Sequence, residues 1–148
     1  MTERMHRTLF AAGTLAVVAL LIAPAGAQAR RAKAPAPPAG VYTEAQAARG
    51  ATLYSDNCVY CHLVDLSGGD LAPALTGPAF TAKWTGRPLD ALFAYMRVQM
   101  PMNSPGGLSA AQNADLVAYL LKKAGFAPGT GDLPADPGAL RSITPARP

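Results

Sequence analysis

The sequence predicts a small all-α domain, with three main helices and long loops, between two proline-rich ends. Three stretches repeat apolar residues at helical spacing, and each carries a residue type that begins or ends helices. No stretch alternates apolar and polar residues convincingly, as a half-buried strand does. Fourteen glycines and fourteen prolines among 148 residues indicate long loops and extended ends around these helices.

The first predicted helix covers residues 43–57, where Thr43 and Gln46 form a capping box at the start. The stretch 63–87 that follows holds four glycines and two prolines, so we expect a long loop there. The apolar face of this first helix consists of Ala47, Gly50, Leu53 and Tyr54.

The second predicted helix covers 88–99, because Pro88 suits the first helical position. The third covers 109–124, where Ser109 and Gln112 form another capping box. The apolar residues of these two helices are Leu89, Leu92, Phe93 and Met96, then Leu116, Val117 and Leu120, and Gly125 is the expected stop.

The start of the chain has the three parts of a secretory signal. Arg4 and Arg7 precede 15 apolar or small residues, roughly 22 Å of helix, which is short for a membrane span. Small residues at 25–27 then offer a cleavage site, and 27–29 offers a second one. We expect residues 1–27 to be removed on export to the periplasm; an uncleaved membrane anchor is the alternative.

Charge divides the mature chain into three segments. Residues 28–42 form a proline- and alanine-rich linker whose three basic side chains carry the +3 charge of the mature chain. Residues 43–125, the predicted folded unit, have six basic and six acidic side chains, and 126–148 read as a neutral, flexible tail. A formal charge of +4 for the whole chain does not indicate a nucleic-acid binder. The basic linker allows weak association with a membrane surface.

Both cysteines lie in one motif, Cys58-Val59-Tyr60-Cys61-His62. Two thiols three positions apart can each add to one vinyl group of a haem, and the next residue, His62, then supplies an imidazole to the iron. The motif therefore predicts one covalent haem c, bound through Cys58 and Cys61.

Three other interpretations compete with haem attachment. A thioredoxin-like redox pair needs a βαβ pattern, which the sequence lacks. A zinc site needs a fourth ligand, and a carboxylate would have to serve, because the remaining histidine, His6, lies in the predicted signal. A disulfide between Cys58 and Cys61 would close too small a loop to stabilise the chain much.

The sixth iron position separates electron transfer from catalysis or gas binding. The mature chain has no second histidine, so methionine is the best remaining soft ligand. Met96 belongs to a helical apolar face and is expected to pack in the core. Met100 precedes Pro101 and should be extended, at a helix end. Met100 and Met102 both stay open as candidates.

The segment from about Tyr42 to Gly125 resembles a class I monohaem cytochrome c, more narrowly the small periplasmic members that serve bacterial dehydrogenases and terminal oxidases. The haem motif is the specific part of this resemblance, and the order and spacing of the other pieces support it. The other matching pieces are residues 46–54, 72–77, 100–109 and 118–121.

The resemblance implies roles for several residues. Met100 is favoured as axial ligand, since the family's methionine commonly stands directly before a proline. Pro73 would give its carbonyl to His62, and Leu75 would pack on the haem. It also implies that Gly50 and Tyr119 form a close helix crossing, and that Trp84 or a tyrosine hydrogen-bonds a haem propionate.

The expected function is one-electron transfer in a respiratory chain, by a monomer whose iron cycles between Fe(III) and Fe(II). The expected partners are redox proteins, a dehydrogenase donor and an oxidase acceptor, rather than nucleic acid, and the chain is not expected to be an enzyme. Because the folded unit is neutral, docking should rest mostly on apolar contacts. One alternative is a fixed electron-transfer subunit of a quinoprotein dehydrogenase or oxidase; another is a haem sensor or peroxidase with an open iron.

Overall fold

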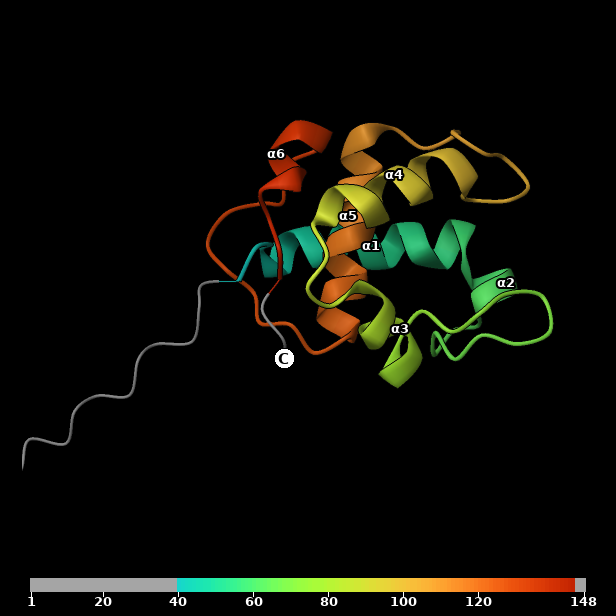
Figure 1. The fold of residues 1–148 in the computed structure, drawn as a ribbon. Coiled ribbons are helices and arrows are strands. Elements are labelled where there is room, and N and C mark those ends of the chain that lie inside the picture. Colours follow the sequence, from blue (N-terminus) through green and yellow to red (C-terminus); the bar gives the residue numbers. More distant parts are fainter. Residues whose placement is uncertain (1–39, 146–148) are drawn as a thin grey trace, which may run out of the picture. The chain divides into compact units, whose positions relative to one another are not determined.

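The computed structural model describes residues 40–145, and the regular elements within this range are all helices (Figure 1). The predicted signal and residues 28–39 of the predicted linker lie outside this range. None of the helices within 40–145 is both long and apolar enough to span a membrane. The helices are α1 (Glu44–Asn57), α2 (Val59–His62), α3 (Gly77–Trp84), α4 (Leu89–Gln99), α5 (Ala110–Lys123) and α6 (Pro137–Arg141).

The three predicted helices are confirmed as α1, α4 and α5. At the start of α5 both halves of the Ser109–Gln112 capping box form. Gly125 follows this helix with φ +88°, a left-handed conformation that glycine adopts easily. Pro88 is the N-cap of α4 and lies one residue outside the helix, so its predicted place as the first helical residue is wrong by one position.

The predicted capping box of α1 forms only in part. The Thr43 hydroxyl accepts the backbone N–H of Gln46 at 3.0 Å. The Gln46 side chain instead bonds the backbone of Leu133, accepting its N–H at 2.6 Å and donating to its carbonyl at 3.0 Å. This buried amide therefore serves a contact across the fold rather than the cap.

Helix α3 lies inside the stretch predicted to be a long loop, so that prediction is wrong for residues 77–84. Pro78 stands in the first turn, where its missing N–H has no helical partner to lose. Phe80 is buried, and Trp84 lies one turn later with its ring centre 6.5 Å from that of Phe80. Packing of this aromatic pair outweighs the poor helix propensity of the flanking glycines.

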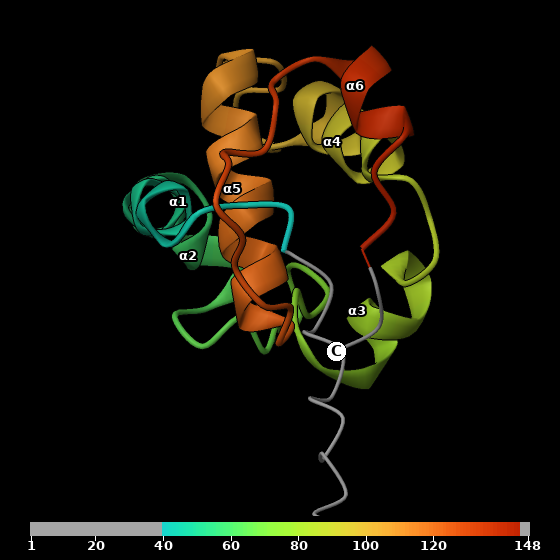
Figure 2. The same ribbon diagram turned by 90° about the vertical axis from the view of Figure 1, so that its left-hand side faces the viewer.

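Helices α1 and α5 cross closely, and this crossing forms the centre of the core (Figures 1 and 2). A Cβ at Gly50 would lie 2.0 Å from the carbonyl oxygen of Asp115 and 2.8 Å from the Cβ of Tyr119. The crossing therefore requires glycine on α1. The ring of Tyr119 also lies 5.3 Å, centre to centre, from that of Tyr54.

Residues 126–145, here called the C-terminal strap, differ from the predicted flexible tail. Leu133 and Leu140 are buried, and α6 packs against α4. The boundary at the other end also shifts, because Tyr42, assigned to the linker, is fully buried and its hydroxyl donates to the carbonyl of Phe126 at 2.5 Å. Tyr42 and Leu133 have hydrogen-bond partners more than 80 positions away in the chain.

Candidate functional site

The chain turns sharply at Cys58, which ends α1 and begins α2. Its N–H still donates to the carbonyl of Tyr54, at 2.9 Å. Its own carbonyl accepts from Cys61 at 3.2 Å and from His62 at 3.0 Å. This single turn of helix holds both cysteines and the histidine together, and both thiols are free.

The ring of His62 is buried and fixed by one contact, in which Nδ1 lies 2.8 Å from the carbonyl oxygen of Pro73. Because a carbonyl only accepts hydrogen bonds, Nδ1 carries the proton. In the neutral tautomer with this proton, Nε2 holds the lone pair that can bind a metal. The resemblance implied this contact, and the structure contains it.

The loop between His62 and α3 is folded back to bring Pro73 over the histidine. Leu63 and Leu66 adopt left-handed φ values of +63° and +64°, which is uncommon for residues with a side chain. The Leu63 carbonyl accepts the Tyr54 hydroxyl at 2.6 Å, and the Leu66 carbonyl accepts the N–H of Leu75 at 2.9 Å. These two bonds hold the strained turns in place.

Gly68 makes the folded loop possible. It has φ +68°, and a Cβ there would lie 2.4 Å from the nitrogen of Ala74 and 2.5 Å from the carbonyl carbon of Pro73. Those two atoms belong to the peptide group whose oxygen contacts His62. The absence of a side chain at Gly68 therefore lets this peptide group approach the histidine.

Met100 lies where the sequence placed it, directly after α4. It caps the helix with an extended backbone and donates its N–H to the carbonyl of Met96 at 2.9 Å. Met96 is buried in the core, as expected. Met100 is half-buried, whereas Met102 is 76% exposed.

Three further residues lie between His62 and α4. Leu75 is half-buried and packs against the core, as does Trp84. The hydroxyl of Thr85 is buried and has no hydrogen-bond partner among residues 40–145. A buried polar group without a partner is uncommon.

Burial raises the pKa of two groups on this side of the fold. Desolvation, with a smaller contribution from Cys61, raises the pKa of the Cys58 thiol to about 11. Desolvation, followed by the charge of Cys58, raises the pKa of Tyr54 to about 12. The tyrosine hydroxyl therefore remains a donor to the Leu63 carbonyl throughout the neutral range.

Residues 45–120, half of the chain, match the protein family described as "Cytochrome C oxidase, cbb3-type, subunit III". The chain belongs to this family of c-type cytochrome domains. The class I cytochrome c resemblance is thereby confirmed, and the all-α fold agrees with it. The family implies a covalently bound haem and a role in electron transfer for this cytochrome.

The chain was also compared with curated proteins and with solved structures. No curated protein matches the cytochrome. Among solved structures, it is similar to the sulfane dehydrogenase SoxCD from Paracoccus pantotrophus, at 28% identity and a TM-score of 0.44. That match covers 53% of this chain and 43% of the SoxCD chain, so the cytochrome spans less than half the length of that relative.

The residues present fit a covalent haem. Cys58 and Cys61 are free thiols on one helical turn, and the contact of Nδ1 with the Pro73 carbonyl leaves Nε2 of His62 available to the iron. In contrast, the His, Cys, Asp and Glu side chains within 40–145 form no group of three or more that could hold a metal ion by themselves.

Sequence reasoning missed two residues that shape the site. Gly68 was one of several loop glycines, and a positive φ cannot be seen in a sequence. Tyr54 counts in the sequence only as part of an apolar helix face. A buried tyrosine usually finds a partner for its hydroxyl, and that is the signal for the second residue.

Proposed function

We propose that the chain is a one-electron carrier of the periplasm, with His62 and Met100 as the axial ligands of one haem c attached to Cys58 and Cys61. When bound, the haem supplies an iron that takes up and releases a single electron. The observation that carries the proposal is the 2.8 Å contact between Nδ1 of His62 and the Pro73 carbonyl. It orients the ring and leaves Nε2 as the ligating atom.

Met100 supports electron transfer rather than catalysis. Its position at the end of a regular helix restrains its backbone, and the residue is half-buried. Met102 follows on a turn and is largely exposed, so it would lose more freedom on ligation. A methionine opposite a histidine raises the reduction potential and closes the iron to outside ligands.

The test replaces each methionine in the holoprotein. Met100→Ala is expected to remove the methionine–iron absorption band, to lower the reduction potential, and to let carbon monoxide bind the reduced protein. Met102→Ala is the matched control and should keep all three properties of the wild type. A Met100→Ala protein with unchanged band and potential would show that the ligand assignment is wrong.

The second candidate is a fixed electron-transfer subunit of a larger dehydrogenase or oxidase complex. The matching family is described as a subunit of a cbb3-type oxidase, which favours this candidate over a sensor or peroxidase. Copurification separates the two roles, because a free carrier leaves the membrane fraction as a monomer while a subunit remains with its complex. A sensor or peroxidase would have an open iron and bind carbon monoxide in the unsubstituted protein.

The proposed partners are redox proteins that meet an apolar surface. Six basic and six acidic side chains leave residues 43–125 without net charge, so long-range attraction contributes little. The side chains of Tyr60 and Val64, on either side of His62, are 83% and 80% exposed. If docking rests on such contacts, electron-transfer rates with a partner will depend weakly on salt.

A further inference from the structure

The two proposed axial ligands lie at the ends of different helices. His62 follows α1 through the turn at Cys58, and Met100 caps the C-terminal end of α4. Helix α1 packs chiefly on α5, whereas α4 packs on α5 and on α6 of the C-terminal strap. The placement of Met100 relative to His62 therefore depends on how α4 is held.

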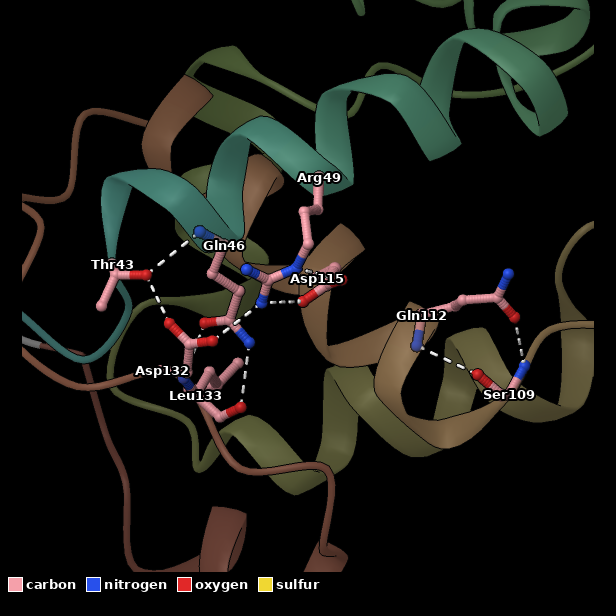
Figure 3. A network of polar contacts seen from close by, with 8 residues as sticks. All are labelled: Thr43, Gln46, Arg49, Ser109, Gln112, Asp115, Asp132 and Leu133. Atoms are coloured by element: carbon pink, nitrogen blue, oxygen red, sulfur yellow. Dashed lines mark hydrogen bonds and ion pairs between the residues drawn. The ribbon is translucent and has the colours of Figure 1, made fainter.

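The strap is bound tightly to the first half of α1 (Figure 3). Gln46, 2% exposed, makes the two hydrogen bonds with the backbone of Leu133 described above. Asp132 accepts from the Thr43 hydroxyl and from Arg49, whose nitrogen lies 2.7 Å away. Arg49 also donates to both oxygens of Asp115 at 3.0 Å, so that one guanidinium connects α1, α5 and the strap.

The other end of the strap is bound to the start of α4. Pro88, the N-cap of α4, makes no side-chain capping bond. The carbonyl of Ile143 replaces that cap by accepting the N–H of Leu89 at 2.9 Å. Leu140 of α6 is fully buried, and Arg141 donates to Asp90 of α4 at 3.1 Å.

We propose that the C-terminal strap is a positioning element, which ties α4 to α1 and so holds Met100 on the iron opposite His62. The inference rests on the His62–Met100 ligation proposed above. It assigns Gln46 and Leu140 roles that act through Met100. Loosening the strap should free the Met100 end of α4 while the α1–α5 core stays folded, since α5 alone would then hold α4.

The test measures imidazole binding to the oxidised, full-length holoprotein, because imidazole competes with the methionine for the iron. Gln46→Met removes the amide at the α1 end of the strap, and Leu140→Ala removes the buried contact at the α4 end. Val117→Ala is the control, since Val117 is equally buried but lies on α5. Circular dichroism and denaturant unfolding measure helicity and the free energy of unfolding for each variant.

We expect both strap variants to bind imidazole about tenfold more tightly with unchanged helicity, because apparent affinity follows the population of the open state. Val117→Ala should leave the affinity within about twofold of wild type, even where it lowers the free energy of unfolding equally. If Leu140→Ala does not accumulate, Leu140→Val takes its place. Equal affinities in strap variants and control at matched stability would overturn the proposal.

A double-mutant comparison separates this proposal from the one it rests on. In a Met100→Ala background, Gln46→Met should have no further effect on imidazole binding, because the competing ligand is gone. An effect that persists there would mean that the strap does not act through Met100. A wild-type protein without the methionine–iron band would instead contradict the axial ligation itself, before any strap variant is made.

Discussion

Gly68 lacks a side chain at the point where the carbonyl group that orients His62 passes over the loop. The two backbone atoms nearest to a Cβ there, at 2.4 and 2.5 Å, are the nitrogen of Ala74 and the carbonyl carbon of Pro73. Backbone cannot move aside as the end of a flexible side chain can. A substitution would therefore displace the partner of the histidine rather than only strain the loop.

Gly68→Ala is expected to lower the free energy of unfolding by about 2 kcal/mol or more, since a backbone clash adds to the left-handed strain. It should also raise the reduction potential of the holoprotein, because an imidazole that has lost the Pro73 carbonyl is a less basic ligand and stabilises Fe(III) less. Thermal unfolding and redox titration measure the two effects.

Gly86→Ala is the matched control for this change. Gly86 has φ +75°, close to that of Gly68, but nothing lies within 4 Å of its Cβ position. We expect a loss of about 1 kcal/mol from conformational strain and an unchanged potential. If both variants changed the free energy of unfolding and the reduction potential equally, the close approach of Gly68 to Pro73 would not affect the haem site.

Single residues also show what a sequence reveals about a site. The cysteine pair and His62 were recognisable because thioether attachment and ligation require neighbours in the chain. Pro73 and Leu75 came from the family resemblance, and the exposure of Met102 came from the structure. Gly68 depends on a loop that folds back on itself, which no local pattern indicates.

At the scale of helices, the crossing of α1 and α5 sets the geometry of the whole core. Gly50 sits where the carbonyl of Asp115 comes within 2.0 Å of a Cβ position. Glycine weakens a helix interior by about 1 kcal/mol relative to alanine, so its presence here is accounted for by the close approach of the two backbones.

Gly50→Ala should raise the helix propensity of α1 and still destabilise the protein by about 1–3 kcal/mol, because overpacking forces α1 and α5 apart. Denaturant unfolding of the holoprotein measures the change. Ala48→Gly, on the exposed side of the same helix, serves as the comparison and should cost about 1 kcal/mol from propensity alone. A more stable Gly50→Ala protein would contradict the tight crossing.

Helices with local signals were predictable, and helices held by distant contacts were not. Ser109 and Gln112 predict the start of α5 from a pattern of four residues, and both halves of their capping box form. Helix α6 has five residues, and Leu140 is buried only because α4 lies beside it. Gln46 looked like half of a capping box, but the amide finds Leu133 87 residues later.

At the scale of the whole molecule, Asp132 connects the strap to α1 by charge. Hydrogen bonds from Thr43, and then from Arg49, lower the pKa of its carboxyl below 3.8. A lowered pKa contributes stability above the unfolded value, and this contribution is lost as pH falls through the folded value. The contacts of the Asp132 carboxylate with Thr43 and Arg49 therefore stabilise the fold at neutral pH, and this stabilisation weakens below pH 3.8.

Asp132→Asn should be less stable than the wild type at pH 7, and the difference between the two should shrink as the pH falls below about 3.8. Urea unfolding across pH 3 to 7 measures it. Asp70→Asn, at an exposed carboxyl on the loop after His62, is the control for the loss of one negative charge. A difference that stays constant with pH would mean that the ionised carboxyl contributes nothing to the strap.

The buried Gln46–Leu133 pair also affects the rate of folding. Tyr42 bonds Phe126, and Gln46 bonds Leu133, near the other end of the domain. The start of α1 can therefore form these contacts only when nearly all of the domain is available. Contacts so distant along the chain slow folding, because a large loop must close before they form. The domain is therefore expected to fold slowly, which prolongs the interval during which the thiols of Cys58 and Cys61 stay accessible.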